Sequence, residues 1–200
     1  MSKQEKLCAV ILSGGGSTRM GEDKSLLTLQ GQPVIVRIFN EMRKVSNQLV
    51  VNQEGPRAEE LMETEHIADL IKDSGPLGGL HTVMKQREEE WFVVTACDTP
   101  FIRAEVFEQL LRLRNPDIDA IVPLYKGRFQ PTSAVYHRRM LPLIESSLKK
   151  GERKVKMVLD QVRTLYPESF SGIEEDALSA HFFNMNTPED YLKAVELAKK

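Results

Sequence analysis

The sequence has few cysteines and no long apolar run, and each shortage excludes a class of protein. Its two cysteines, Cys8 and Cys97, lie far apart and outside any C-x-x-C spacing, so neither a disulfide framework nor a zinc site is encoded, and each is expected to pack inside a strand. The apolar run at residues 7–12 is too short for a signal-peptide core or a membrane span, and no later segment reaches the required length. We therefore expect a cytoplasmic protein without a membrane segment.

An excess of charge of one sign is also missing. The 200 residues carry 27 basic and 29 acidic side chains, a formal net charge of -2 at pH 7. Such a chain has no electrostatic footprint for nucleic acid, so any anionic ligand has to be bound by local loops. With 41% hydrophobic residues the chain can fill one core, and residues 1–200 are predicted to form a single domain.

Histidines placed for acid–base catalysis are lacking as well. None of the four lies at a spacing typical of a general base, a metal pair or a nucleophile partner, so structural or surface roles are predicted for His66, His81, His137 and His181. A reaction that needs no base fits this absence. Attack by a phosphate monoester is such a reaction, because its second pKa of about 6 leaves it largely ionised at neutral pH.

A glycine-rich segment directly follows the first apolar run. Residues 12–24 read L-S-G-G-G-S-T-R-M-G-E-D-K. Glycine allows positive φ, so several backbone N–H groups can turn toward one anion, while Arg19 and Lys24 add the charge that a triphosphate requires. We interpret the segment as a phosphate-binding loop. The alternative is a mobile surface loop with incidental charges, which the position directly after a strand disfavours.

The two common phosphate motifs do not fit this segment. Gly16 and Gly21 have the Walker A spacing, but Glu22 stands where that motif has its lysine. The dinucleotide-binding pattern requires a third glycine at the position that Arg19 occupies. The sequence therefore predicts neither a P-loop nor a resting NAD site.

Short apolar runs alternate with amphipathic segments along the chain, which predicts an α/β fold. Strands are predicted at residues 7–12, 48–52, 67–71, 91–97, 120–124 and 132–136, and helices at 33–45, 56–63, 80–87, 103–113, 138–149 and 188–199. Residues 75–79 are predicted to break the chain before the third helix, and residues 126–128 to form a hairpin turn before an antiparallel strand. We expect a Rossmann-like domain with a mostly parallel central sheet, helices on both faces and a small antiparallel addition in the C-terminal half.

Asp98 is predicted at the edge where such a sheet binds its ligands. It follows the most apolar segment, residues 91–97, which we place at the centre of the sheet. A single carboxylate suits Mg²⁺, which commonly takes one or two carboxylates plus phosphate oxygens and water. The alternative is that Asp98 caps the following helix. With a metal at Asp98, Lys24 and Arg19 would offset the charge that builds up as pyrophosphate leaves, which indicates a nucleotidyltransferase.

Four motifs give the chain a family resemblance. Residues 12–24 resemble the N-terminal loop L-x-G-G-x-S-x-R-M-G-x-D-K of the molybdenum cofactor guanylyltransferases, with Ser13 where that family usually has alanine. Residues 75–79 (G-P-L-G-G) are similar to its G-P-L-A-G, residues 97–100 (C-D-T-P) to its C-D-x-P, and residues 184–189 (N-M-N-T-P-E) to its N-x-N-T-P-E. These matches span almost the whole chain.

The resemblance implies an enzyme that transfers GMP from GTP to the phosphate of molybdopterin, with Mg²⁺ bound at Asp98 and pyrophosphate released. Asp98, Lys24 and Arg19 would be the catalytic residues, with Arg19 facing the triphosphate. The family's aspartate after the third strand is matched best by Asp69, although Asp73 competes. Carried over in this way, the GTP-binding residues are Leu12, Ser13, Gly14, Gly15, Lys24, Asn52, Asp69 and Asp98.

The resemblance also implies that the N-terminal half binds the nucleotide and the C-terminal half molybdopterin. Gly79, Asn184 and Asn186 would line the molybdopterin side together with residues 130–132, since amides suit the donors and acceptors of a pterin edge. A second interpretation stays open, because residues 186–189 also match a helix start with Thr187 as N-cap. Other cofactor-biosynthesis proteins and acceptor molybdoenzymes are the protein partners this implies.

Three other functions fit parts of the pattern. The cytidylyl enzyme for molybdopterin typically has L-A-A-G where Gly14 and Gly15 stand here, and sugar nucleotidyltransferases usually run much longer than 200 residues. A non-catalytic carrier of molybdopterin or of a guanine nucleotide would not need Lys24, Arg19 and Asp98, which are all present. The guanylyl reaction is therefore favoured.

Overall fold

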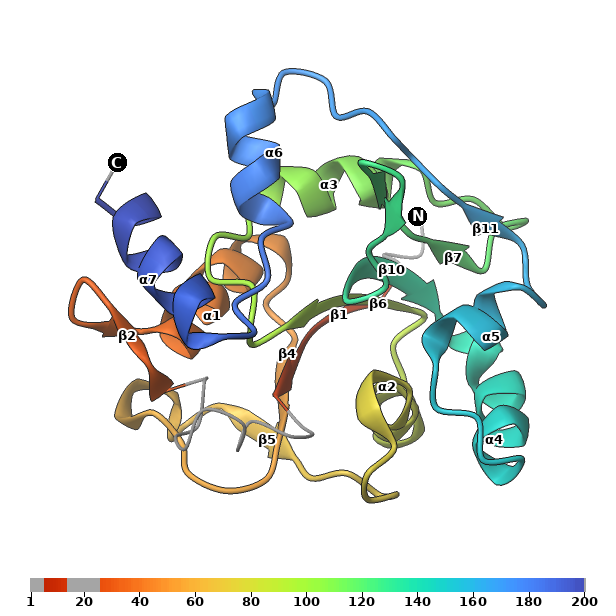
Figure 1. Ribbon diagram of the computed structural model, residues 1–200. Coiled ribbons are helices and arrows are strands. Elements are labelled where there is room, and N and C mark those ends of the chain that lie inside the picture. Colours follow the sequence, from red (N-terminus) through yellow and green to blue (C-terminus); the bar gives the residue numbers. More distant parts are fainter. Residues whose placement is uncertain (1–5, 14–25, 200) are drawn as a thin grey trace.

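A seven-stranded sheet forms the centre of the computed structural model, which describes residues 6–13 and 26–199 (Figure 1). In order across the sheet, the strands are β11 (Thr164–Leu165), β7 (Ala120–Ile121), β10 (Ser133–His137), β6 (Trp91–Ala96), β1 (Leu7–Ser13), β4 (Leu49–Gln53) and β5 (Glu65–Ile67). Only β10 runs antiparallel to its neighbours in this sheet. The predicted α/β fold, with a mostly parallel sheet and an antiparallel addition from the C-terminal half, is confirmed.

Both faces of the sheet are buried, because alternate residues of its central strands enter two separate hydrophobic clusters. In β1, Ala9 and Ile11 pack into one cluster and Cys8 and Val10 into the other, and all four are fully buried. Burying a side chain the size of valine or isoleucine stabilises the fold by about 1.5–3 kcal/mol. Continuous apolar runs therefore mark the middle of this sheet, and β6 is its central strand, as predicted.

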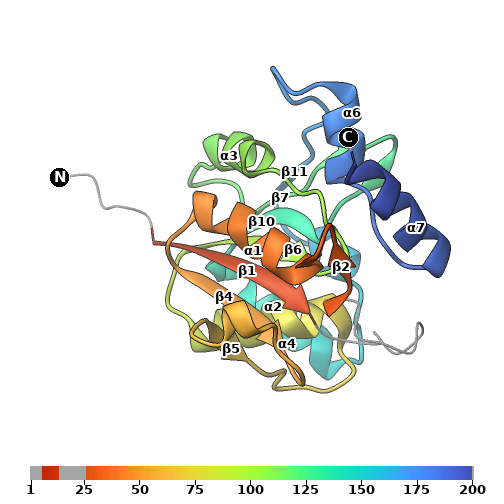
Figure 2. The same cartoon turned by 90° about the vertical axis from the view of Figure 1, so that its left-hand side faces the viewer.

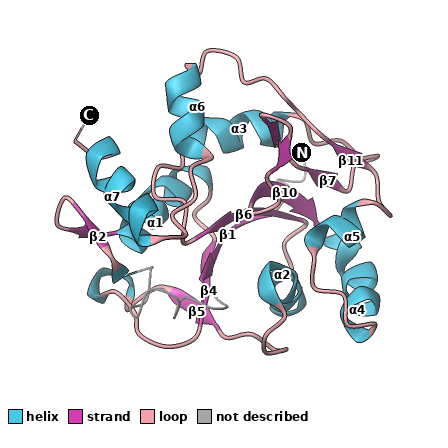
Figure 3. Ribbon diagram, viewed as in Figure 1, coloured by secondary structure: helices cyan, strands magenta, loops and turns pink. Residues whose placement is uncertain are grey.

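Helices cover both faces of the sheet, as Figure 3 shows. Helix α1 is typical, because Ile35, Ile38 and Met42 recur at three- and four-residue spacing and are all buried. Among the described residues, no helix is long and apolar enough to cross a bilayer. The helices on the Ile11 face are α1 (Val34–Val45), α3 (Ala104–Arg112), α6 (Glu175–His181) and α7 (Pro188–Leu197), and those on the Val10 face are α2 (Gly75–Gln86), α4 (Leu141–Lys149) and α5 (Val155–Leu159).

Helix α2 corrects the predicted chain break at residues 75–79. The helix begins at Gly75 and contains the whole G-P-L-G-G motif, with Pro76 in its first turn, where a missing N–H costs nothing. A Cβ at Gly78 would overlap the Cβ of Ser74, and Gly79 is equally restricted by the sheet. These two glycines therefore allow close packing of the helix and do not interrupt it.

Several predicted boundaries are also wrong. The strand expected at 67–71 is β5 and ends at Ile67, while Leu70 and Ile71 are exposed. The helix expected at 56–63 is a single 3₁₀ turn, Glu59–Leu61. The strand expected at 120–124 is split into β7 and β8 (Leu124–Tyr125). Elements of two or three residues are held mainly by backbone hydrogen bonds, so their side-chain pattern is a weak guide to where they begin and end.

The predicted hairpin turn at residues 126–128 is confirmed. Strand β8 pairs antiparallel with β9 (Arg128–Phe129), and the connecting Lys126 and Gly127 have φ of 48° and 72°. Positive φ at both positions is typical of the tight turns that match the twist of a hairpin. By contrast, α5, β11 and α6 lie in a region for which the sequence predicted no element.

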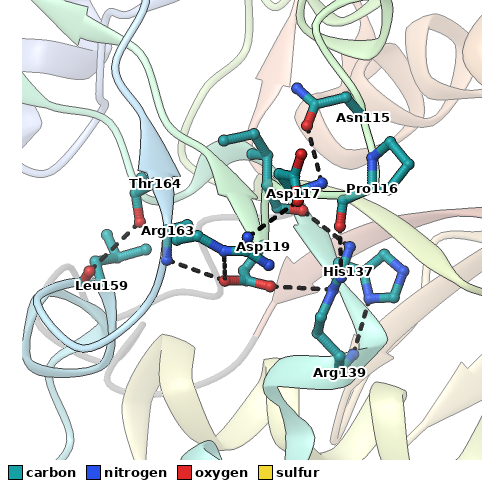
Figure 4. A network of polar contacts seen from close by, with 10 residues as sticks. Asn115, Pro116, Asp117, Asp119, His137, Arg139, Leu159, Arg163 and Thr164 are labelled. Atoms are coloured by element: carbon teal, nitrogen blue, oxygen red, sulfur yellow. Dashed lines mark hydrogen bonds and ion pairs between the residues drawn. The ribbon is translucent and has the colours of Figure 1, made fainter.

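A network of charged side chains holds the short outer strands together at the amino end of β7 (Figure 4). Asp119 is 8% exposed, and its carboxylate accepts hydrogen bonds from the backbone N–H of Arg163 at 3.0 Å and pairs with the Arg139 Nε at 3.0 Å. Arg139 also donates to the carbonyl of Pro116 at 2.7 Å, and Arg163 to Asp117 at 3.2 Å. The network ties β11 to β7 at the sheet edge opposite the carboxyl ends of β1 and β6.

Candidate active site

The carboxyl ends of β1, β4, β5 and β6 meet at one edge of the sheet, which lies on the right in Figure 2. Within this edge, Leu12 pairs in register with Asn52 on one side and with Ala96 on the other. The backbone N–H of Cys97 donates to the Leu12 carbonyl at 2.9 Å, so the chain that leaves β6 stays beside the end of β1. Asp98 is therefore carried to this edge.

Four of the predicted site residues, Gly14, Gly15, Arg19 and Lys24, lie outside the described residues, and their roles stay predictions. The remaining candidates all lie in or next to segments at the carboxyl edge, where they form two groups. One group surrounds the end of β4 and the other surrounds the segment after β6. Together they comprise Leu12, Ser13, Asn52, Asp69, Gly79, Asp98, Asn184 and Asn186.

Asn52 and Asp69 form a hydrogen-bonded pair at the end of β4. The Asn52 side chain is 2% exposed, and its Nδ2 donates to the carbonyl of Ile67 at 3.0 Å and to the Asp69 Oδ1 at 2.8 Å. Burial raises the pKa of the Asp69 carboxyl above its ordinary value, although the bond from Asn52 works against this. Asp73 is exposed and has a φ of 55°, so Asp69 is the aspartate that adjoins Asn52.

Gly79 brings helix α2 against the same pair. A Cβ at this position would overlap the Oδ1 of Asn52 and lie 2.9 Å from the Cδ2 of Leu12. The glycine thus lets the helix backbone approach the ends of β1 and β4. Gly79 is therefore a neighbour of the Asn52 side of the edge, whereas the sequence predicted it on the side of Asn184 and Asn186.

Ser13 and Gln53 are the register partners at the extreme ends of β1 and β4. Both residues are buried, and within the described part of the chain neither the Ser13 Oγ nor the Gln53 Oε1 has a hydrogen-bond partner. Both atoms lie at the edge where open α/β sheets bind their ligands. Gln53 was not predicted from the sequence, where its signal is a polar side chain directly after Asn52 at a strand end.

The segment after β6 is shaped by two threonines. The Thr99 Oγ1 donates to the carbonyl of Ala96 at 2.7 Å and lies 3.1 Å from the Thr95 Oγ1, which closes a tight turn around Asp98. Helix α3 begins at Ala104 with Arg103 as its N-cap residue. The alternative role of Asp98 as a helix cap is therefore wrong. Its half-buried side chain sits at the carboxyl edge, as a metal-binding carboxylate requires.

The N-M-N segment lies directly beside Asp98. The backbone N–H of Met185 donates to the Asp98 carbonyl at 2.8 Å, which places Asn184 and Asn186 on either side of this contact. Asn184 is half-buried, whereas Asn186 is exposed and leads into α7. Thr187 caps that helix in a capping box, so the second interpretation of residues 186–189 as a helix start is confirmed.

Asp98 is the carboxylate that the sequence analysis assigns to a metal at this edge. Among residues 6–13 and 26–199, no three His, Cys, Asp or Glu side chains are grouped to hold an ion. Asp98 alone still fits Mg²⁺, because that ion keeps several waters and is commonly held by one or two carboxylates and substrate phosphates. The donor set therefore suits a metal that arrives with a nucleotide.

The model of the MobA-like NTP transferase domain matches residues 9–165, which include most of β1, all of β4 and β6, and the segment of Asp98. The chain belongs to this family. The resemblance predicted from the four motifs is thereby confirmed, and the protein is a nucleotidyltransferase. Enzymes of this family generally use a divalent metal ion.

Relatives of the MobA-like family match nearly the entire chain. A probable molybdenum cofactor guanylyltransferase of Bacillus licheniformis is 36% identical over 188 residues, which cover 90% of this chain and 92% of that protein. One from Bacillus anthracis is 34% identical over 194 residues, covering 94% and 96%. The crystal structure of molybdopterin-guanine dinucleotide biosynthesis protein A from Archaeoglobus fulgidus superposes with a TM-score of 0.79 at 27% identity, over 96% of this chain and 98% of that one.

Proposed function

We propose that the protein transfers GMP from GTP to the phosphate of molybdopterin and releases pyrophosphate. The relatives named above support the substrate pair, since they match more than nine tenths of their own length. The observation that carries the proposal is the hydrogen bond from the Met185 N–H to the Asp98 carbonyl. This bond joins the nucleotide half of the edge to the Asn184 segment, so one site can hold both substrates.

We assign the nucleotide to the end of β1 and β4. Burial raises the pKa of the Asp69 carboxyl, which means that it disfavours the charged form. N–H donors such as the N1–H and amino group of guanine would stabilise that charged form. Asn52 fixes the orientation of that carboxylate, and Ser13 and Gln53 offer further hydrogen-bonding atoms. The phosphates would be bound by Gly14, Gly15, Arg19 and Lys24 together with Leu12.

We assign molybdopterin to the other half of the same domain. Asn184 is half-buried beside the Asp98 segment and can present its amide to a pterin edge. Residues 130–132 reach the same edge, because the next residue, Ser133, pairs with Thr95 near the end of β6. Residues 1–200 would thus form one domain with a nucleotide half and a pterin half. We expect it to act in the cytoplasm with other cofactor-biosynthesis proteins and acceptor molybdoenzymes.

The chemistry needs positioning and charge more than proton transfer. An oxygen of the molybdopterin phosphate forms a bond to the α-phosphorus of GTP, and the bond from that phosphorus to the bridging oxygen breaks to release pyrophosphate. The attacking phosphate is largely ionised at neutral pH, so no general base is required. Asp98 would hold Mg²⁺, which supplies neutralisation of the phosphate charge when bound. Lys24 and Arg19 would stabilise the leaving group.

A nucleotide competition assay tests this proposal. Purified protein, molybdopterin and Mg²⁺ are mixed with GTP, CTP or UTP, and both the dinucleotide product and pyrophosphate are measured. We expect GTP to be strongly preferred. A preference for CTP would identify a cytidylyltransferase, UTP with a sugar phosphate a sugar nucleotidyltransferase, and tight binding without pyrophosphate release a carrier.

The Asp98→Ala variant tests the metal-dependent step separately. We expect it to lose Mg²⁺-dependent pyrophosphate release while its far-ultraviolet circular dichroism stays unchanged. Asp117→Ala is the matched control, because Asp117 is an exposed aspartate in the network at the opposite edge of the sheet. Normal turnover of the Asp98→Ala variant would remove Asp98 from the mechanism.

A further inference from the structure

His181, the last residue of α6, is a buried polar group that the reaction described above does not use. Its side chain has no exposure to solvent, and both of its ring nitrogens are hydrogen-bonded. The Nδ1 accepts the backbone N–H of Arg103 at 2.9 Å, and the Nε2 lies 2.8 Å from the Oγ of Ser133. Because Nδ1 accepts a backbone N–H, the ring proton is on Nε2 and is donated to Ser133.

The two partners of the ring belong to two different parts of the active-site edge. Arg103 ends the segment that begins at Asp98, and Ser133 begins strand β10 beside Thr95 of β6. Four residues after His181, the Met185 N–H holds the Asp98 carbonyl. The segment 98–103 is therefore held at both of its ends by the single stretch 181–185. Asn184 lies within that stretch.

Packing alone does not account for a histidine at this position. The ring lies among aromatic side chains, with centroids 5.3 Å from Phe107 and 4.6 Å from Phe182. An apolar side chain would fill such a site without the cost of burying two ring nitrogens. The polar ring is used instead to satisfy the Arg103 N–H and the Ser133 hydroxyl, which fixes three elements relative to one another.

We propose that His181 is a positioning residue that sets the distance between the Asp98 segment and the Asn184 segment, and so aligns the two substrates. This rests on the proposed function, in which these two segments contact nucleotide and pterin. A shift of one segment by about 1 Å is enough to lower a rate by as much as 100-fold, because the reacting atoms must be aligned. His181 acts through Asp98 and Asn184 and contacts no substrate itself.

Two amide substitutions separate positioning from packing. In His181→Asn the side-chain oxygen can take the place of Nδ1 and still accept the Arg103 N–H, whereas in His181→Gln the longer amide reaches Ser133 and leaves Arg103 without its acceptor. Both remove an aromatic ring from the same cavity, so both should lose similar stability. We expect His181→Gln to lower kcat at saturating GTP by about 10- to 100-fold. His181→Asn should stay within about threefold of the wild-type kcat, since the bond to the Asp98 segment is kept.

The same comparison gives two further readouts and a control. In His181→Gln we expect a higher Mg²⁺ concentration for half-maximal rate and a nearly unchanged KM for GTP. The Asp119→Asn control weakens the charged network at the opposite edge of the sheet, so it should lower stability without changing kcat. A wild-type kcat in His181→Gln, or equal losses in the Asn and Gln variants, would overturn the proposal.

Hydrogen exchange keeps this test independent of the proposed function. If the wild-type protein makes no dinucleotide product, the proposed function fails, but the contacts of His181 can still be measured. The Arg103 and Met185 amide protons are expected to be protected in the wild type and in His181→Asn. Both should exchange faster in His181→Gln. Unchanged protection in His181→Gln would show that the ring does not hold the Asp98 segment.

Discussion

The protonation of His181 links the stability of the fold to pH. Burial lowers the pKa of His181 from 6.5 to about 3, and the positive charge of Arg103 adds to this shift. The ring is therefore neutral in the folded protein at every pH above about 3. In the unfolded chain the same ring takes up a proton near its ordinary pKa. Below that pH the unfolded state binds more protons than the folded state, so stability falls as pH is lowered.

The size of this effect follows from the two pKa values. The contribution of His181 to the free energy of unfolding is fully present above its unfolded pKa and decreases until the pH reaches the folded pKa. Each pH unit between the two pKa values lowers the free energy of unfolding by about 1.4 kcal/mol. Lowering the pH from 7 to 5 should therefore cost about 2 kcal/mol, and the whole window about 5 kcal/mol. A loss of this size is a large part of the stability of a typical domain.

Urea unfolding of the wild type and of His181→Asn measures the effect. The asparagine does not titrate, so its variant should lose about 2 kcal/mol less than the wild type between pH 7 and pH 5. Other groups with shifted pKa values, such as His66 and Asp69, are present in both proteins and cancel in the comparison. If the free energy of unfolding depends on pH equally in the two proteins, the assignment of His181 as a buried neutral histidine is refuted.

Three further predictions concern substitutions of single residues. Gly79→Ala would push a Cβ into the Oδ1 of Asn52, so we expect a loss of about 1–3 kcal/mol from overpacking and a higher KM for GTP. Asp69→Asn removes a carboxyl whose pKa burial raises while it keeps an oxygen for the bond from Asn52, so stability should not fall, although the KM for GTP should rise at least about tenfold. Thr187→Ala removes the capping box with Asp190 and should cost about 1 kcal/mol without changing kcat.

Urea unfolding and steady-state kinetics with varied GTP check all three predictions. A Gly79→Ala variant as stable as the wild type would contradict the predicted overpacking against Asn52. For Asp69 the contradiction would be an unchanged KM in the asparagine variant, which would leave the nucleotide contact to another residue. For Thr187, a fall in kcat at unchanged KM would show that the start of α7 takes part in the reaction.

The sequence predicted those parts of the fold in which local pattern and tertiary packing agree. The strands β1 and β6 are continuous apolar runs because both sheet faces are covered, and α1 has its three-residue and four-residue spacing because one side of it is buried. The strands β7 and β11 have two residues each, and the backbone bond to Asp119 helps to fix their pairing. Such pairing leaves no periodicity in the sequence. The chain break predicted at residues 75–79 is wrong because glycine is typical both of chain breaks and of places where a helix packs closely against its neighbours.

The candidate site was predictable where a residue follows a strand directly. Asp98 could be placed at the carboxyl edge for this reason, and Asn52 was predicted at the end of its strand and assigned to the nucleotide by the family resemblance. The choice of Asp69 over Asp73 also came from the resemblance, and only the folded chain shows the contact of Asp69 with Asn52. His181 could not be found in this way, because its partners lie 48 and 78 residues away. Only the folded chain brings them together.

The reversed direction of β10 has a consequence for the part of the edge that we assign to molybdopterin. A parallel strand in that place would bring only its trailing loop to the active-site edge, whereas β10 begins there, close to where β7 ends. The whole connection from residue 122 to residue 132, including the β8–β9 hairpin, therefore leaves and re-enters the sheet at its active-site end. Surface connections tolerate insertions and substitutions far better than strands do. The half that we assign to molybdopterin can thus diversify in length and composition without disturbing β4, which carries Asn52, or β6, which leads to Asp98.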